Sequence, residues 1–288
     1  MKEQHELLVV KDNELIENFI FNATELELQI LNYAVAVTNP YWEAKDHIYR
    51  ISIPELVATY KTKSKNAYKV YREALERLQI RTYRYHNGVK EVTENVLRKI
   101  MRDTTDNSYL EICFNDYIAT RLNNLKGLFT QYDIKNISKF SSRYAFILYE
   151  FFKMKLDKSV EVSYLHQTSV NALKDNLSIQ GKYLVFAELK RNVIDRAKTQ
   201  INKHSDINLD YQVIKTGRTP THIKFIAKYK KKAHAKEIEA KKAKPVEHQT
   251  QLLIGNTVKE SSPGFTEHHK TTAKKHLDNL KRKTGIKT

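Results

Sequence analysis

One order of secondary-structure patterns occurs twice along this chain, and that order limits the fold more than any single motif. In the first half, a helical pattern over residues 22–39 is followed by a strand pattern over 47–53, helical patterns over 54–61 and 64–78, and strand-like runs over 80–114. Apolar residues recur at i, i+3 and i+4 in the helical segments. A helix-turn-helix followed by a β-hairpin is the order of a winged helix, so we predict a fold of the α+β class.

Local signals support these element boundaries. Thr24 stands three residues before Glu27, which is the spacing of a capping box at a helix N-terminus. Ser64 is a candidate N-cap for the longer of the two following helices. The pair Asn87-Gly88 is typical of a tight turn in a β-hairpin.

The second half repeats this order with different residues. The segment RYAFILYEFFKMKL is a helical pattern that is apolar on nearly every side, so we expect a buried helix. A strand over 160–164, a short helix over 169–177, a long helix from Tyr183 to about Asn202 and a hairpin over 209–227 follow. The expected core face of the long helix consists of Phe186, Leu189, Val193, Ile194, Ala197 and Ile201. We therefore predict two tandem winged-helix domains.

Net charge divides the chain into three parts. The 288 residues include 50 Lys and Arg against 33 Asp and Glu, a net charge of +17. Residues 1–130 hold 18 of each sign and are neutral, residues 131–229 hold 17 against 9 for a net +8, and residues 230–288 hold 15 against 6 for a net +9. A net positive charge of this size suggests a partner rich in phosphate. If that partner is nucleic acid, we expect the domain over 131–229 to supply more of the phosphate contact than the domain over 1–130, because neutralised phosphates release counterions. The domain over 1–130 is then free for self-association and an auxiliary DNA contact.

Residues 230–288 have few large apolar side chains, and we interpret them as a basic, low-complexity, disordered tail. The alternative is a basic arm that adds non-specific affinity for DNA. The single Cys113 cannot form an internal disulfide, and the charged first segment lacks the apolar core of a signal peptide. No run approaches 18 apolar residues, so we expect a cytoplasmic protein without a membrane partner.

The usual motifs of enzymes are absent from the sequence. With only 7 glycines it contains neither a GxxxxGK phosphate loop nor a GxGxxG motif, and it has no HExxH motif. A rolling-circle nicking enzyme would need two histidines flanking one apolar residue beside a nucleophilic tyrosine, and no such histidine pair occurs. We therefore predict no enzymatic activity, no cofactor and no metal site. Dispersed carboxylates that meet in space are the alternative.

In a winged helix, the first turns of the recognition helix read bases, while the wing holds phosphates. In the second domain we expect DNA contacts from the helix residues Lys182, Tyr183, Lys190, Arg191 and Lys198 and from the wing residues Lys215, Arg218 and Thr219. In the first domain the corresponding candidates are Lys65, Lys69 and Arg72. Arg191 and Lys190 have the donors to address guanine O6 and N7. For each residue, the alternative is a solvated polar surface that does not touch DNA.

Three passages of the sequence resemble one known family. They are VVKDNELIEN near the start, LKGLFTQYDIKNISKFSSRYAFILYEFFK across the domain junction, and FAELKRNVIDRAKTQINKHSDINLDYQVIKTGRTPTHIKF through the second recognition helix and wing. With the order of elements, the similarity extends over about residues 7–229. On these residues the chain resembles the iteron-binding plasmid replication initiators, the Rep proteins with two winged-helix domains.

The resemblance implies a protein that binds directly repeated double-stranded DNA sites, the iterons, at a plasmid origin as a monomer and promotes opening of the adjacent duplex. It also implies contacts with the host initiator and the replicative helicase, and a homodimer, formed through the first domain, that represses the protein's own promoter. The residues after 229 match no part of the family pattern. The alternative function is that of a winged-helix transcriptional repressor without a role at an origin.

Overall fold

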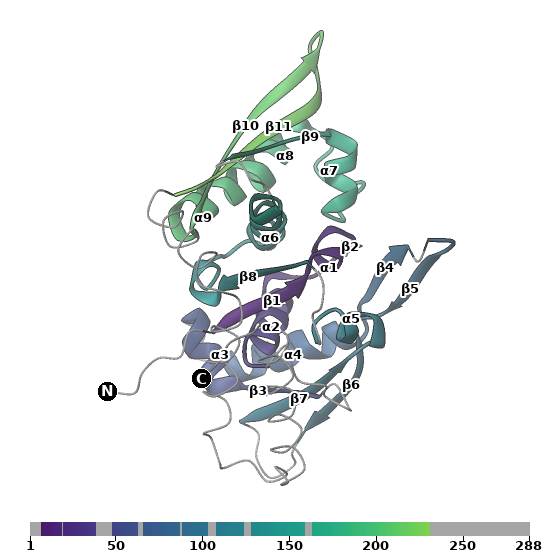
Figure 1. The fold of residues 1–288 in the computed structure, drawn as a ribbon, viewed down its shortest axis with the longest axis vertical. Helices are drawn as coiled ribbons and strands as arrows, with labels where there is room; N and C mark the ends of the chain where they lie inside the picture. The colour runs from purple at the N-terminus through teal and green to yellow at the C-terminus, as the bar shows by residue number, and fades with distance from the viewer. Residues whose placement is uncertain are drawn as a thin grey trace, which may run out of the picture. The chain divides into compact units, whose positions relative to one another are not determined.

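The first domain contains the predicted winged helix. In this computed structural model, the described residues are 7–18, 20–38, 48–62, 66–86, 88–102, 108–123, 128–158 and 163–230. The winged-helix elements are α2 (Glu25–Ala36), β3 (Ile48–Ser52), α3 (Ile53–Tyr60), α4 (Ala67–Gln79), β6 (Leu97–Arg102) and β7 (Tyr109–Phe114), with the strands in the antiparallel order β3-β7-β6 (Figure 1). On α4, Tyr71, Leu75 and Leu78 are buried, as their helical spacing predicts.

The capping box at the start of α2 is confirmed. The Glu27 backbone N–H donates to Thr24 Oγ1 at 3.4 Å, and the Thr24 backbone N–H donates to Glu27 Oε2 at 2.8 Å. The buried Glu27 carboxylate also accepts from Arg81 Nε at 2.8 Å, so the cap joins α2 to the segment that follows α4. Ser64, the predicted cap of α4, lies outside the described residues. The residue before α4 is Asn66, whose side chain makes no cap hydrogen bond.

The strand-like runs after α4 form two hairpins rather than one. The hairpin predicted at Asn87-Gly88 is β4 (Thr82–His86) with β5 (Glu91–Asn95); Gly88 has a φ of +91°, and Asn87 lies outside the described residues. This hairpin pairs with β2 (Ile20–Phe21) in a separate sheet of the order β2-β4-β5. The wing of the first domain is therefore β6–β7, because β7 pairs with β3.

The second domain repeats the order of elements, which confirms two winged helices. They are β9 (Ser163–Ser169), α7 (Val170–Asn176), α8 (Phe186–Leu189), the π-helical segment η2 (Lys190–Asp195), α9 (Arg196–His204), β10 (Ile207–Thr216) and β11 (Thr219–Tyr229). The strands form an antiparallel sheet in the order β10-β11-β9. The predicted strand over 160–164 is thus found three residues later along the chain, as β9. Figure 1 shows the β10–β11 hairpin extending beyond the helices of this domain.

The start of the recognition helix differs from the prediction. The continuous helix formed by α8, η2 and α9 begins at Phe186, not at Tyr183. Tyr183 has a φ of +50°, which a right-handed helix cannot contain. Lys182 and Tyr183 therefore lie in the turn before the helix, and the prediction that they are helix residues is wrong.

The turn at the tip of the wing has two residues. Lys215 and Thr216 belong to β10, and the turn consists of Gly217 and Arg218 alone. Gly217 has a φ of +60°, the left-handed conformation that favours glycine in a two-residue hairpin turn. The pairing register of the two strands shifts between Ile214 and Lys215, so the last part of the wing is a slightly irregular ladder.

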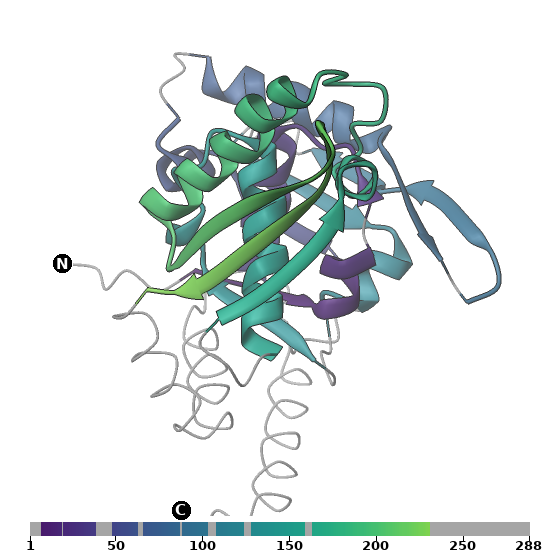
Figure 2. The ribbon, with the colours of Figure 1, turned by 90° about the horizontal axis from the view of Figure 1, so that it is seen from above.

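One long helix, α6 (Arg143–Lys158), joins the two domains. The remaining elements are β1 (Leu8–Asp12), α1 (Asn13–Asn18), α5 (Asp116–Thr120), β8 (Phe129–Asp133) and the 3-10 turn η1 (Ile134–Asn136). Antiparallel pairing of β1 with β8 brings the start of the chain beside the segment that enters α6. As predicted, α6 is buried on nearly every side: it contacts α1, α2 and β8 of the first domain and β9, β11 and α9 of the second (Figures 1 and 2).

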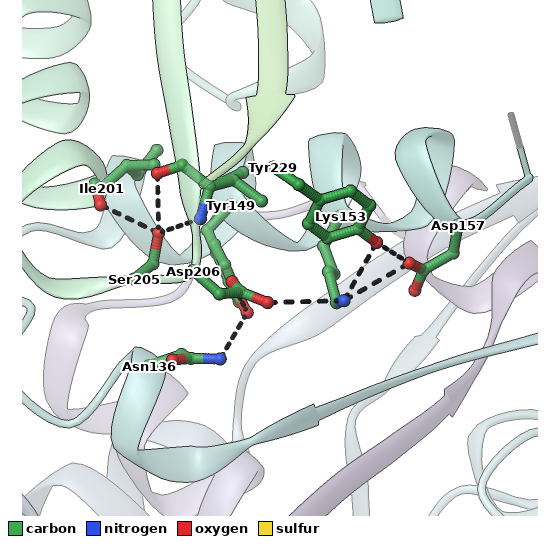
Figure 3. Close-up of polar contacts among 9 residues, drawn as sticks. Asn136, Tyr149, Lys153, Asp157, Ile201, Ser205, Asp206 and Tyr229 are labelled. Carbon is green, nitrogen blue, oxygen red and sulfur yellow. Dashed lines mark hydrogen bonds and ion pairs between the residues drawn. The ribbon is translucent and has the colours of Figure 1, made fainter. Parts of the chain in front are cut away.

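A buried polar network fastens the β10–β11 hairpin to α6 (Figure 3). Lys153 Nζ, on a side chain that is 1% exposed, lies 3.3 Å from Asp157 Oδ1 and 3.4 Å from Asp206 Oδ2. It also donates to Tyr229 Oη at 3.0 Å, and Tyr149 Oη donates to Asp206 Oδ1 at 2.8 Å. Asp206 directly precedes β10 and Tyr229 ends β11. Both ends of the hairpin are therefore held by side chains of α6.

Candidate nucleic-acid interface

The recognition helix of the second domain buries one face and exposes the other. Five residues of the predicted core face are fully buried, which confirms this part of the prediction: Leu189, Val193, Ile194, Ala197 and Ile201. Phe186 is only partly buried. The opposite face carries Lys190 and Arg191, which are exposed, and Lys198, which is partly exposed. The helix therefore presents cations to solvent beside the wing.

Two of these cations are paired within the protein. Lys190 Nζ lies 2.9 Å from Asp195 Oδ2, and Lys198 Nζ lies 2.6 Å from Asp210 Oδ1. Both ammonium groups also lie near the ring of Tyr211 on β10, at 5.9 and 5.6 Å from its centroid. Tyr211 Oη donates to Asp195 Oδ1 at 2.5 Å. These five side chains form a polar clamp between the recognition helix and β10.

The clamp shifts the acid-base properties of its members. The hydrogen bond to Asp195 is the largest cause that raises the pKa of Lys190. Burial acts to raise the pKa of Asp195, but hydrogen bonds from Tyr211 and Lys190 outweigh it and lower that pKa. The hydrogen bond from Lys198 lowers the pKa of Asp210. All three groups are therefore charged at neutral pH, and contact of Lys190 or Lys198 with DNA would compete with a carboxylate.

Arg191 differs from its two neighbours. Its side chain is exposed, its Nε donates to Asn192 Oδ1 at 3.4 Å, and no carboxylate of the described residues lies within 4.0 Å of it. Its guanidinium can therefore form a two-point hydrogen bond without first leaving an ion pair. Of the helix residues predicted to contact DNA, Arg191 is the one best suited to base reading.

The wing presents the predicted cations at its tip. Lys215 near the end of β10, Arg218 in the turn and Thr219 at the start of β11 are all exposed. Neither Lys215 nor Arg218 forms an ion pair with a described residue. Both cations stand on a hairpin whose base is fixed to α6, so they can reach the phosphate backbone from a defined position.

The turn before the helix carries features that sequence reasoning missed. Tyr183 is half-buried: its hydroxyl lies 3.1 Å from that of Tyr144, and Lys174 Nζ donates to its carbonyl oxygen at 2.8 Å. The two residues that follow, Leu184 and Val185, are 83% and 60% exposed. The sequence pattern could have indicated the exposure of Leu184 and Val185, because neither residue belongs to the i, i+3, i+4 series of apolar residues that begins at Phe186. Lys182 is exposed in the same turn.

The first domain offers a weaker set of candidates. Lys69 on α4 is exposed and lies 3.9 Å from Glu73, which is the long end of an ion-pair distance. Arg72 is partly buried, and Lys65 lies outside the described residues. The three predicted residues are therefore not shown to form one surface, and their contact with DNA stays a prediction.

Other kinds of site are not indicated in the part of the chain that the structure describes. There, no group of three or more His, Cys, Asp or Glu side chains is arranged to hold a metal ion. No helix within the same residues is long and apolar enough to cross a membrane. Cys113 is buried in β7 as a free thiol.

Comparison with known proteins identifies both domains. The family model of the initiator replication protein WH1 domain matches residues 8–153, and that of the initiator Rep protein WH2 domain matches residues 169–227. No curated protein sequence matches the chain. The crystal structure of the Pi initiator protein in complex with iteron DNA is similar, with 19% identity, a TM-score of 0.62, and coverage of 78% of this chain and 98% of that one. The WH1 domain of MSBI1.176, a replication protein isolated from a multiple sclerosis patient, aligns over 35% of this chain and 82% of its own at 14% identity, with a TM-score of 0.24.

Proposed function

The chain belongs to the initiator replication protein family, and from this premise we propose that it binds repeated double-stranded DNA sites, iterons, at a plasmid origin and promotes opening of the adjacent duplex. The observation that carries the proposal is the exposed, cation-bearing surface formed by the recognition helix and wing of the second domain. In this arrangement the helix enters a major groove and the wing contacts the neighbouring backbone. The net charge of +8 over residues 131–229 also supports the assignment of the main DNA contact to the second domain.

Within this surface we assign different tasks to different cations. Arg191 would read a guanine through O6 and N7, because its guanidinium is exposed and has no carboxylate partner among the described residues. Lys215, Arg218 and Lys182 would hold phosphates. Lys190 and Lys198 would either attract the DNA backbone electrostatically from within their ion pairs, or contact a phosphate after breaking those pairs with Asp195 and Asp210.

Two winged helices on one chain suit a repeated site. Recognition elements that stand about 34 Å apart can enter successive major grooves on one face of a duplex, which corresponds to a repeat of about 20 base pairs for each monomer. The structural likeness to the Pi initiator, whose structure contains iteron DNA, supports this mode of binding. We propose that the first domain, over residues 1–130, provides the auxiliary contact from α4.

We further propose that the first domain mediates a homodimer that represses the protein's own promoter, and that the host initiator and replicative helicase act with the monomer at the origin. The neutral charge of residues 1–130 supports self-association over tight DNA binding. Residues 230–288, with a net charge of +9, would add non-specific DNA affinity.

Selection from a random duplex library by the full chain, followed by footprinting on plasmid DNA, tests the binding proposal. We expect one enriched sequence that occurs as direct repeats beside the gene, with a footprint of about two helical turns on each repeat. Enrichment of a single inverted repeat at the promoter alone would instead indicate a repressor without origin function. Absence of any enriched sequence would contradict both functions.

A further inference from the structure

The turn before the recognition helix places two apolar side chains in solvent at the surface that the proposed function assigns to DNA. Leu184 is 83% exposed and Val185 is 60% exposed, and both are among the most exposed large apolar residues described. Each side chain left in water forgoes the free energy that burial would give it. Two such residues side by side in a turn rich in polar neighbours need a reason.

Val185 also occupies a position where another residue type would stabilise the protein. It is the N-cap of α8, and its side chain makes no cap hydrogen bond. Ser, Thr, Asp or Asn at an N-cap accepts a hydrogen bond from the first turn, and the loss of such a cap typically costs about 1 kcal/mol. The sequence therefore has a valine where helix stability favours a capping residue, and such departures from local preference are often found at functional sites.

The turn that presents this apolar pair is held rigidly. Lys174 Nζ donates to the Tyr183 carbonyl oxygen at 2.8 Å, and the Tyr183 hydroxyl lies 3.1 Å from the Tyr144 hydroxyl. The rings of Tyr144 and Tyr183 meet edge to face, with centroids 6.4 Å apart. These contacts fix Tyr183 at a φ of +50°, which turns the chain so that the next two side chains stand away from the core.

We propose that Leu184 and Val185 read thymine in the major groove, by packing against the C5-methyl group of one or two thymines of the repeat. The inference rests on the proposed function, and it names a second kind of base contact beside that of Arg191. Apolar side chains distinguish thymine by this methyl group, which is exposed in the major groove and absent from the other bases. Burial of one methyl group between such partners accounts for a discrimination of about fourfold, from about 0.8 kcal/mol.

The surroundings of the pair favour DNA over a protein partner. Lys182 stands two residues before Leu184, and Arg191 stands six residues after Val185 on the recognition helix; both cations are exposed. An apolar protein surface would have to desolvate these charges without a counter-charge, whereas DNA supplies phosphates around the groove in which the thymine methyl groups lie. The apolar pair and the cations therefore suit one and the same ligand.

The test removes the methyl group from the DNA and the side chain from the protein. The full chain selects its duplex from a random library, and each thymine of the selected site is then replaced singly by deoxyuracil, which pairs as thymine does but lacks the methyl group. Affinities of the wild type, Leu184→Ala and Val185→Ala are measured for every duplex. Leu165→Ala is the matched control, because Leu165 is 55% exposed in the same domain but lies on β9, away from the recognition helix.

We expect the wild type and Leu165→Ala to lose about fourfold in affinity at one or two thymine positions. Leu184→Ala or Val185→Ala should bind the thymine and the deoxyuracil duplex equally at those positions, while the cost of changing the guanine read by Arg191 stays as in the wild type. A selected site that shows no loss with deoxyuracil, or a loss that both variants retain, overturns the inference and leaves the proposed function standing. If no sequence is selected at all, the inference and the proposed function fail together.

Discussion

Lys153 in the middle of α6 and Asp206 at the entrance to β10 form a buried ion pair, with Nζ and Oδ2 3.4 Å apart. The same ammonium lies 3.3 Å from Asp157, so one cation serves two carboxylates in a largely buried site (Figure 3). A buried charge that loses its partner remains desolvated without compensation. Lys153 is therefore one of the contacts, with the Tyr149–Asp206 hydrogen bond and the pairing of β11 with β9, that hold the β10–β11 hairpin in position.

Lys153→Met should destabilise the protein by about 3–5 kcal/mol, because it leaves Asp157 and Asp206 without their cation. Unfolding in urea, followed by circular dichroism, measures this loss. Lys139→Met, at an exposed position that precedes α6, is the control and should change stability by less than about 0.5 kcal/mol. Equal stability of the two variants would show that the network around Lys153 contributes little.

His166 on β9 should make stability fall as the solution becomes mildly acidic. Burial, and after it the charge of Lys155, lowers the pKa of His166 below 6.5. Its ring lies 4.9 Å from that of Phe151 on α6. Because the folded pKa is lower than the unfolded one, the unfolded chain binds more protons below pH 6.5, and stability declines as pH falls through the folded pKa.

Comparison of urea midpoints at pH 7.5 and pH 5.5 tests this expectation. The midpoint difference between the two pH values should be smaller in His166→Gln than in the wild type. His204, whose pKa is lowered by burial and by Lys203, should contribute in the same direction, so His204→Gln is a second, independent check. An unchanged or larger difference in His166→Gln would contradict the burial of a neutral histidine.

Replacement of Arg191 and of Lys215 by alanine should change DNA binding in different ways. Arg191→Ala should cost about 1–3 kcal/mol at one base pair and relax the preference there, because a two-point contact to guanine is lost. Lys215→Ala should weaken binding almost equally across sequences and reduce the slope of log K against log salt by about one, because a phosphate contact is lost. Competition binding with single-base variants at several salt concentrations separates the two patterns. A preference profile that Arg191→Ala leaves intact would remove this residue from base reading.

Asp195→Asn should increase affinity for DNA of any sequence. The substitution keeps an acceptor for Tyr211 but removes the carboxylate that lies 2.9 Å from Lys190 Nζ, so the ammonium becomes available to a phosphate. Asp116→Asn is the control, because it removes a carboxylate from the exposed pair with Arg98 in the first domain. Titration of a random duplex at several salt concentrations measures the effect. Equal affinities of the two variants would indicate that Lys190 has no part in the interface.

Elements whose signals are local could be predicted from the sequence. The capping box of Thr24 and Glu27 and the apolar spacing of α4 depend on residues within a few positions of each other. The buried character of α6 follows from the spread of its aromatic and aliphatic residues over nearly every side of the helix. With local signals of this kind, the sequence predicted the order of helices and strands in both winged helices.

Features set by distant residues could not be predicted in the same way. Tyr183 leaves the helix because Lys174 and Tyr144 hold it, and neither contact is visible in a local pattern. Lys198 is paired because the register of β10 brings Asp210 beside the recognition helix. The β4–β5 hairpin forms its own sheet because it pairs with β2, some 60 residues earlier in the chain. Long-range pairing thus decides which cations remain available to DNA.

Replication of a plasmid that carries the origin but lacks the gene, with the protein supplied in trans, tests the central claim most directly. We predict that the wild-type chain sustains this plasmid, and that Arg191→Ala, which should fold normally because its side chain is exposed, fails to do so. Leu165→Ala, exposed on β9, should replicate the plasmid like the wild type. A wild-type chain that protects the repeats from cleavage but does not sustain the plasmid would contradict the account.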